Sequence, residues 1–410
     1  MQRKLSPAAL LTILTGLNLL NYFDRFIVSA VLESIKGQFI LSDSQTGFIS
    51  MAFMLGYFVT SPFFGYLGDR MSRKWLIAVG ILVWSLGTVL TGFATDYGHL
   101  IACRILVGVG EASYATMSPG LISDSFAPAK RNNALTIFYV AIPLGAAFGT
   151  LFGSWAGAHH GWPYAFIWAG LPGLLLAFSL LPFREPLRGE SEGKAGLPEF
   201  AAKPSVKDIF GLFKIPSYNL VVGGYIAYTF AMGAYVHWGQ AFLQRIHHLP
   251  QQTAGNFFGG VMVVAGLVGT FLGGFAATAW QKRNSAGYAF TLGLSVLGAV
   301  PLAFLFATLG SANHVMVCMA VAMFLLFLST GPVNTVIIEA VPVNLRASAM
   351  ALSIFMIHLF GDVWSPFVVG AVSDHLGSLA YGLMILPGAL LLCSVLWLAL
   401  AMRIVRLRRK

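Results

Sequence analysis

Charged side chains are scarce in this sequence. Lys, Arg, Asp and Glu make up 10% of the 410 residues, whereas hydrophobic residues make up 57%. Soluble domains carry about 25% charged residues, and a water-soluble fold could not hide so much apolar surface. The composition therefore excludes an ordinary soluble domain and predicts a protein whose solvent is lipid.

Cysteine and the common catalytic motifs are scarce as well. Cys103, Cys318 and Cys393 each lie within an apolar run and show no C-x-x-C spacing, which argues against a metal site and a disulfide. The sequence has no G-x-x-x-x-G-K-S/T phosphate loop, so we expect no direct use of ATP. It has neither histidine spacing for a metal nor a nucleophile motif. We therefore predict that the protein is not an enzyme and has no cofactor or metal.

Basic residues outnumber acidic ones by 25 to 15, which gives a net charge of +10. The basic residues lie in every second connection between the apolar runs, for example at 70–74, and in the C-terminal tail at 403–410. The other connections hold few basic residues beyond Lys36 and Arg245. This distribution follows the positive-inside rule. It predicts a multi-pass protein of the inner (plasma) membrane with both termini in the cytoplasm. It gives no reason to expect a nucleic-acid partner. The first four residues run directly into a hydrophobic segment, so we expect no cleavable signal.

Twelve apolar runs are each long enough to cross a bilayer as a helix. They fall near 8–31, 46–66, 75–95, 99–122, 133–157, 163–182, 217–243, 254–279, 286–309, 313–338, 347–372 and 379–402. The polar segment 184–215 divides them into two sets of six. We therefore predict an all-α membrane protein with an N-terminal six-helix bundle (1–183), a cytoplasmic linker and a C-terminal bundle (216–410). Residues 205–213 within the linker fit a short amphipathic helix.

The two halves repeat at an offset of about 210 residues. The positions of Pro128, Arg131 and Ala134 correspond to three positions of the second half, Pro342, Arg346 and Ala349. Asp124 corresponds in the same way to Glu339. Two similar halves predict two bundles related by pseudo-symmetry.

The connection between the second and third runs, from Gly65 to Lys74, contains an acid, three bases and two glycines. It resembles the loop signature of the major facilitator superfamily, Gly-x-Leu-x-Asp-Arg-x-Gly-Arg-Lys, with Ser72 in place of the last Gly. The resemblance implies twelve helices in two bundles, with the substrate bound at their interface. It also implies a conformational latch made by Gly65, Gly68, Asp69, Arg70, Arg73, Lys74, Asp124, Arg131, Glu339 and Arg346.

Charged residues at membrane depth are costly, so each is a candidate for function. In the first helix, Asn18, Asn21 and Arg25 share a face, which should look into the bundle. Asp24 points about 100° away from Arg25, so neither needs the other as its only partner. Asp24 is either part of a structural ion pair or a protonation switch, because burial and a nearby Arg act on a carboxyl group in opposite directions.

The fourth helix carries Arg104 and Glu111, which lie two turns apart on one face. Glu111 should lie near the middle of the membrane, where we expect Arg25 of the first helix to be its partner. In the second half, His358 and Asp362 lie one turn apart in the eleventh helix. The fifth helix has glycines at 145, 149, 153 and 157, a pattern that predicts close helix packing.

Several longer sequence segments point to one family within this superfamily. They are Asn21 to Phe26, Gly108 to Tyr114, Gly361-Asp362 with Ser365 to Phe367, and Ser373-Asp374. Together they resemble the Spinster family of lysolipid and sphingolipid transporters. This resemblance implies a monomeric secondary transporter that works by alternating access. It would move an amphipathic lipid, such as a lysophospholipid or a sphingosine-1-phosphate-like molecule, with the proton as coupling ion.

We assign two groups of residues on this basis. The charge network for proton coupling consists of Asp24, Arg25, Arg104, Glu111 and Asp362. The substrate cavity consists of Asn18, Asn21, Arg25, Glu111, His237 and His358. Three other functions stay open: a proton-coupled transporter of a small organic anion or drug, a channel, and a receptor that transports nothing.

Overall fold

The chain is helical almost throughout in its computed structural model, which describes residues 3–4, 6–186, 206–342 and 345–409. An α-helix satisfies its backbone hydrogen bonds within one segment, which lipid requires of any spanning element. The predicted all-α class is confirmed. Most of the predicted linker lies outside the described residues, and its helix α8 covers Val206–Gly211.

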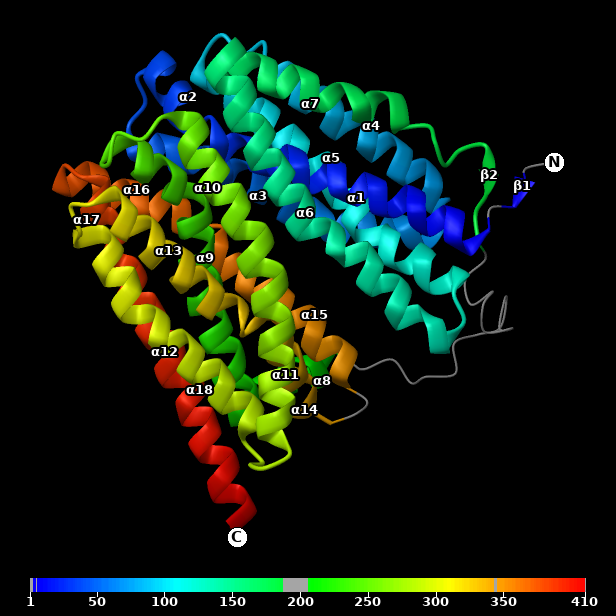
Figure 1. Cartoon of the computed structure of the whole chain (residues 1–410). Coiled ribbons are helices and arrows are strands. Elements are labelled where there is room, and N and C mark those ends of the chain that lie inside the picture. Colours follow the sequence, from blue (N-terminus) through cyan, green and yellow to red (C-terminus); the bar gives the residue numbers. More distant parts are fainter. Residues whose placement is uncertain (1–2, 5, 187–205, 343–344, 410) are drawn as a thin grey trace. The chain divides into compact units, whose positions relative to one another are not determined.

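The chain forms two compact units. Unit 1 comprises Met1–Leu41, Phe48–Phe200 and Pro250–Gly259, and unit 2 comprises Ser42–Gly47, Ala201–Leu249 and Gly260–Lys410. The following paragraphs describe each unit by itself (Figure 1).

Unit 1 holds the first seven helices, except for the first turn of α3, and the start of α10. Its elements are β1 (Arg3–Lys4), α1 (Pro7–Ala30), α2 (Leu32–Phe39), α3 (Asp43–Arg70), α4 (Arg73–Thr91), α5 (Tyr97–Ser125), α6 (Pro128–His160), α7 (Trp162–Leu176) and β2 (Phe183–Arg184). The two short strands pair in parallel, with Arg3 opposite Phe183 and Lys4 opposite Arg184.

Unit 2 holds the remaining elements, apart from residues 251–259 of α10. They are α8, η2 (Leu212–Lys214), α9 (Pro216–Arg245), α10 (Gln251–Val264), η3 (Ala265–Gly269), α11 (Thr270–Gln281), α12 (Gly287–Thr308), α13 (Ala312–Phe327), α14 (Thr330–Glu339), α15 (Arg346–Ile357), η5 (His358–Asp362), α16 (Ser365–Leu376), α17 (Leu379–Leu383) and α18 (Ile385–Arg409). The elements η3 and η5 are short π-helical segments within predicted continuous spans, and such segments often mark functional positions.

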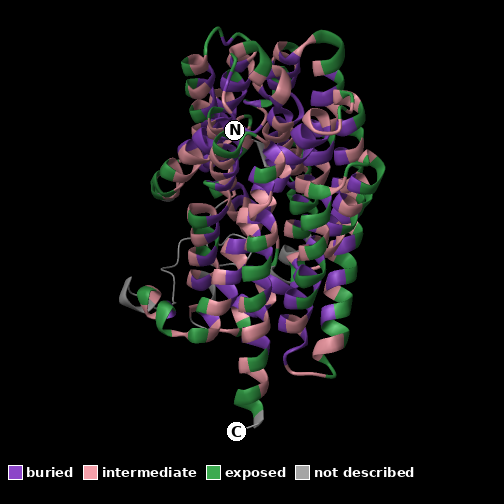
Figure 2. Ribbon diagram, turned by 90° about the vertical axis from the view of Figure 1, so that its left-hand side faces the viewer, coloured by how far each residue is buried: buried purple, intermediate pink, exposed green. Residues whose placement is uncertain are grey.

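Ten helical segments of the described chain are long and apolar enough to cross a membrane. The other two predicted runs are occupied by α1, which has 24 residues, and by α7, an apolar helix of 15 residues. The predicted twelve spans therefore all have a helix. Exposed and buried positions alternate along these helices (Figure 2), as expected of helices that face lipid on one side. Leu175 and Phe275 are among the exposed apolar residues.

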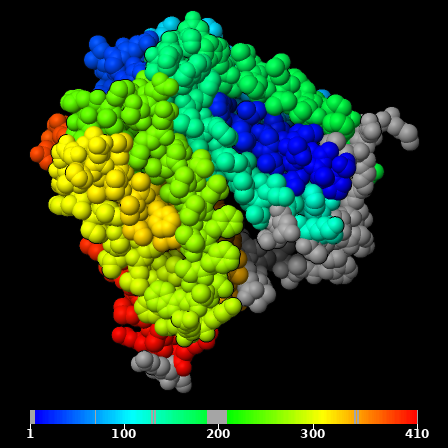
Figure 3. All heavy atoms as spheres, in the orientation of Figure 1, coloured from blue at the N-terminus to red at the C-terminus, as the bar shows by residue number. Residues whose placement is uncertain are grey.

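The glycine series of the fifth predicted span makes a close helix contact in unit 1. A Cβ atom at Gly145 would lie 2.5 Å from the carbonyl oxygen of Leu19, and one at Gly149 would lie 2.2 Å from that of Phe23. These contacts place α6 directly against α1, and Figure 3 shows their side chains side by side on the surface. The predicted role of the series in packing is confirmed.

Candidate functional site

An ion pair between α1 and α5 forms the centre of the candidate site in unit 1. The Nη2 and Nε atoms of Arg25 lie 2.7 and 3.2 Å from the same oxygen of Glu111, Oε2. The Glu111 side chain is fully buried, whereas that of Arg25 is 20% exposed. The predicted partnership is therefore present, and one end of it is accessible.

Three aromatic rings surround the guanidinium group of Arg25. Its Cζ atom lies 4.7 Å from the ring centre of Tyr22, 4.9 Å from that of Phe53 and 5.3 Å from that of Tyr57. Arg104 lies 5.0 Å from the centre of the same Phe53 ring. The faces of aromatic rings attract cations, so Phe53 stabilises two arginines of like charge close to each other.

Asp24 lies in the same buried region but not in the ion pair. Thr88 of α4 donates a hydrogen bond of 3.5 Å to its Oδ2 atom, so Asp24 faces α4 and not Arg25, as the helical geometry predicted. Several buried polar atoms of this region have no hydrogen-bond partner among the described residues: Asn21 Nδ2, Asp24 Oδ1, Arg104 Nε and Nη1, and Glu111 Oε1. Buried groups of this kind normally have partners, so the cluster has capacity for a proton, water or ligand.

Glycines bring the helices of this site together. A Cβ atom at Gly108 of α5 would lie 2.1 Å from the carbonyl oxygen of Phe53, and one at Gly56 of α3 would lie 2.5 Å from that of Ile105. The backbones of α3 and α5 therefore touch, and the Phe53 ring lies close to both arginines. Close approach of this kind needs residues without a side chain.

The predicted cavity residues lie in different surroundings. Asn18 donates a hydrogen bond of 2.9 Å to the carbonyl oxygen of Phe138 in α6, so its amide joins α1 to α6. In unit 2, His237 is buried beside the Trp238 ring, with ring centres 4.8 Å apart. His358 Nδ1 lies 3.0 Å from both carboxylate oxygens of Asp362 in the π-helical segment η5. The roles of these residues stay predictions.

The predicted latch contains a second charged cluster of unit 1. Arg73 Nη1 binds Asp124 Oδ2 at 2.7 Å, and Arg73 Nε binds Glu185 Oε1 at 2.9 Å. Lys74 Nζ donates to the carbonyl oxygen of Phe183 at 2.7 Å, and the Arg70 guanidinium lies 3.6 Å from the Tyr66 ring centre. The side chains of three further predicted latch residues lie outside the described set: Asp69, Arg131 and Arg346.

Glu185, which the sequence did not single out, holds the start of α4. It accepts hydrogen bonds from the amides of Arg73 and Lys74 at 3.2 and 3.4 Å and from the Ser72 hydroxyl at 2.6 Å. Burial acts to raise the pKa of Glu185, but the bonds from Arg73 and Ser72 outweigh it and lower the pKa below its ordinary value. A carboxyl group with a lowered pKa stabilises the fold above its unfolded-state pKa, and the benefit is lost as the pH falls through the folded-state value.

Replacing Glu185 by Gln should therefore loosen the start of α4 at neutral pH. We expect the amides of Arg73 and Lys74 to exchange with solvent about tenfold faster, because each loses a charge-assisted bond. The wild-type protein should show the exchange rate of the variant, after correction for intrinsic exchange, only at a pH below the ordinary pKa of a glutamate, where Glu185 is protonated. Hydrogen exchange followed by mass spectrometry measures this effect. Asp96→Asn, which alters the cap of α5 at His99, is the control and should leave these amides unchanged.

Comparison with known proteins identifies the family. The model of the Major Facilitator Superfamily matches residues 14–366. Protein spinster homolog 1 of Xenopus laevis is 36% identical, over 89% of this chain and 72% of that protein. The chain belongs to the Spinster family of this superfamily. It is accordingly a transmembrane transporter and not an enzyme, as predicted.

Other relatives agree with this assignment. Protein spinster of Drosophila melanogaster is 34% identical over 88% of this chain, which spans 61% of the length of that relative. The sphingosine-1-phosphate transporter SPNS2 of Danio rerio is 33% identical to this Spinster-family chain. The match covers 97% of this chain and 84% of the Danio rerio protein.

Solved structures share the fold. The crystal structure of a bacterial homolog of the human lysosomal transporter Spinster, in an inward-facing and unoccupied conformation, superposes with a TM-score of 0.82 at 23% identity, over 98% of this chain and 97% of that one. A D-xylose-proton symporter superposes with a TM-score of 0.75 at 17% identity, over 94% and 96% of the two chains. These likenesses confirm the predicted major facilitator fold.

Proposed function

We propose that this Spinster-family protein is a proton-coupled transporter of an amphipathic lipid with one acyl-like chain and an anionic or zwitterionic phosphate headgroup. The observation that carries the proposal is the ion pair of Arg25 with the fully buried Glu111. Two relatives support the substrate class by name, the sphingosine-1-phosphate transporter of Danio rerio and a probable sphingolipid transporter of Arabidopsis thaliana.

The charge balance of the site explains how a proton and an anion would be linked. Asp24 and Glu111 carry two negative charges, and Arg25 and Arg104 carry two positive charges, so the cluster is neutral when all four are ionised. One added proton leaves a net charge of +1. A buried charge requires a partner, and an anionic headgroup supplies it. Protonation of the cluster would therefore favour binding of an anion.

The hydrogen bonds of Glu111 indicate where that proton would bind. Both bonds from Arg25 reach Oε2, and Oε1 has no partner in the described part of the chain. A proton on Oε1 removes the negative charge that holds Arg25. The guanidinium group, already partly exposed, then becomes free for the two parallel hydrogen bonds that arginine makes to phosphate. Loss of the proton restores the ion pair and expels the headgroup.

The transport cycle would alternate the access of this site between the two sides of the membrane. We further propose that the termini lie in the cytoplasm, as the positive-inside distribution predicts, that the bundles are 1–183 and 216–410, that the protein resides in the plasma membrane and that it works as a monomer. Arg104, which has two buried donor atoms without a described partner, would contribute a second positive charge to the headgroup site.

A substrate screen in proteoliposomes tests this function. We expect an inward proton gradient to drive uptake of lysophospholipids or sphingosine-1-phosphate, because protonation converts the site to a net positive charge. Soluble organic anions should not compete, since they lack a chain to bury. Competition by those anions would instead favour the alternative substrate class. Current without saturable uptake would favour a channel, and a lack of any gradient-driven uptake would contradict the proposal.

A further inference from the structure

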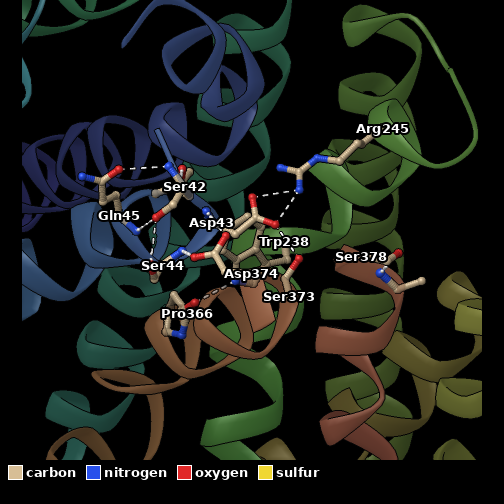
Figure 4. A network of polar contacts seen from close by, with 12 residues as sticks. Ser42, Asp43, Ser44, Gln45, Trp238, Arg245, Pro366, Ser373, Asp374 and Ser378 are labelled. Atoms are coloured by element: carbon tan, nitrogen blue, oxygen red, sulfur yellow. Dashed lines mark hydrogen bonds and ion pairs between the residues drawn. The ribbon is translucent and has the colours of Figure 1, made fainter. Parts of the chain in front are cut away.

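Another buried carboxylate, which belongs to unit 2, lies at the first residue of α3. Asp43 is 4% exposed, and its two oxygens lie 2.7 and 2.8 Å from Nη1 of Arg245, at the end of α9. The hydroxyl of Ser373 in α16 donates to Asp43 Oδ2. Figure 4 shows this group in unit 2. The group joins three helices through a single side chain.

Asp374 binds the same helix start through its backbone. Its carboxylate oxygens accept from the amides of Asp43 and Ser44 at 2.7 and 2.8 Å, a favourable place for an anion because a helix start carries partial positive charge. The neighbouring amides are satisfied locally: that of Ser42 by the Gln45 side chain at 2.9 Å, and that of Gln45 by the Ser42 hydroxyl at 3.1 Å. This reciprocal pair is a capping box, so α3 keeps a cap of its own if Asp374 leaves.

Backbones also meet directly at this helix start. A Cβ atom at Gly47 would lie 2.3 Å from the carbonyl oxygen of Pro366, and one at Gly370 would lie 2.3 Å from that of Asp43. Contact through glycines buries little apolar side-chain surface, and burial of such surface is the main source of adhesion between packed elements. The glycine contacts themselves therefore add little adhesion to that of the polar and ionic bonds at the start of α3.

The first turn of α3 groups with unit 2, and the rest of the helix, from Phe48, groups with unit 1. The start of α10 shows the converse arrangement, because Pro250–Gly259 groups with unit 1. There Gln251 donates to the carbonyl oxygen of Ala30 at 3.0 Å and accepts from Ser34 at 3.2 Å. Asp43 and Gln251 lie at an offset close to that of the two sequence halves. If the units move as separate bodies, a helix shared by both must either bend or give up one of its two sets of contacts.

We propose that Asp43, Arg245, Ser373 and Asp374 form a releasable clasp. In the released state the first turn of α3 leaves α9 and α16, and it keeps its helical start through Ser42 and Gln45. In the bound state Arg245 neutralises one of the two carboxylates and the helix start stabilises the other. The clasp serves as a conformational switch, and its chemistry does not depend on which substrate the protein moves.

Hydrogen exchange of the full-length protein in nanodiscs tests the clasp without any transport assay. Replacing Arg245 by Met should make the amides of Asp43 and Ser44 exchange about tenfold faster or more, because the bound state loses a charged hydrogen-bond partner. Arg245→Lys should stay close to wild type, since one nitrogen serves both oxygens of Asp43 and an ammonium group can replace it. Arg283→Met, at an exposed turn of the same unit, is the matched control.

Ionic strength distinguishes a releasable clasp from a permanent cap. Raising NaCl from about 0.1 M to about 1 M screens charges that have moved into solvent, so it should favour the released state and accelerate exchange at Asp43 and Ser44. The effect should be present in wild type and in Arg245→Lys, and absent in Arg245→Met. The proposal would be overturned if exchange at Asp43 and Ser44 in wild type did not respond to salt. It would also be overturned if Arg245→Met had normal thermal stability and left this exchange unchanged.

Discussion

Glu111→Gln should abolish proton-driven uptake while leaving exchange of the lipid across the membrane in place. Glutamine has the shape of the protonated acid but cannot release a proton, so the site should stay in its anion-binding form. Removing one partner of a buried ion pair typically costs about 3–5 kcal/mol. A loss of this size in the proton-dependent step should lower gradient-driven uptake about a hundredfold or more. Uptake under a pH gradient and counterflow without one, both in proteoliposomes, measure the two effects.

Two further variants make this test specific. Asp24→Asn removes the other buried carboxylate, which bonds Thr88 and not Arg25, and it shows whether the proton resides on Glu111 alone. Asp96→Asn alters an exposed carboxylate that caps α5 and should transport normally. If Glu111→Gln still responds to the pH gradient, Glu111 does not carry the proton. If only Asp24→Asn loses the response, the protonation switch is Asp24.

Gly149→Ala should produce a large loss of stability in unit 1. Its Cβ atom would lie 2.2 Å from the carbonyl oxygen of Phe23, a backbone atom next to Asp24 and Arg25 that cannot rotate away. Overpacking of a tight contact typically costs about 1–3 kcal/mol. We expect a lower melting temperature in detergent, together with reduced transport, because α1 would shift with respect to α6.

A second glycine provides the matched control. Gly16 lies in α1 with nothing within 4 Å of the position of a Cβ atom. Alanine there should be neutral or stabilising by up to about 1 kcal/mol, because it favours the helix over glycine. An equal loss of stability in both variants would indicate that the effect at Gly149 is not steric.

The clasp and the ion pair of the candidate site are different kinds of contact. Arg25 and Glu111 lie within helices that face lipid, and we propose that a proton controls their separation. Arg245 and Asp43 lie at helix ends, where the arginine side chain is 23% exposed and water competes for its bonds. We therefore expect salt to act on the clasp, and a proton gradient to act on the candidate site.

The sequence by itself determined the architecture of this protein. Lipid imposes the same requirement on each spanning segment, namely that it be apolar, about 20 residues long and internally hydrogen-bonded. The twelve spans can therefore be recognised one at a time. The same argument marks Arg25 and Glu111, since a charge in an apolar segment stands out against its neighbours, and helical spacing separates Arg25 from Asp24.

Only the tertiary structure decided which polar groups at the helix ends meet. The capping box of Ser42 and Gln45 is visible in the sequence and could have moved the predicted start of the second span from 46 to 43. Nothing local, however, indicates that Asp374, about 330 positions away, binds the same amides, or that Glu185 holds the start of α4. Charged residues are common at helix ends, so their presence there does not mark a functional contact. The partner of each charged residue depends on how helices distant in the sequence pack.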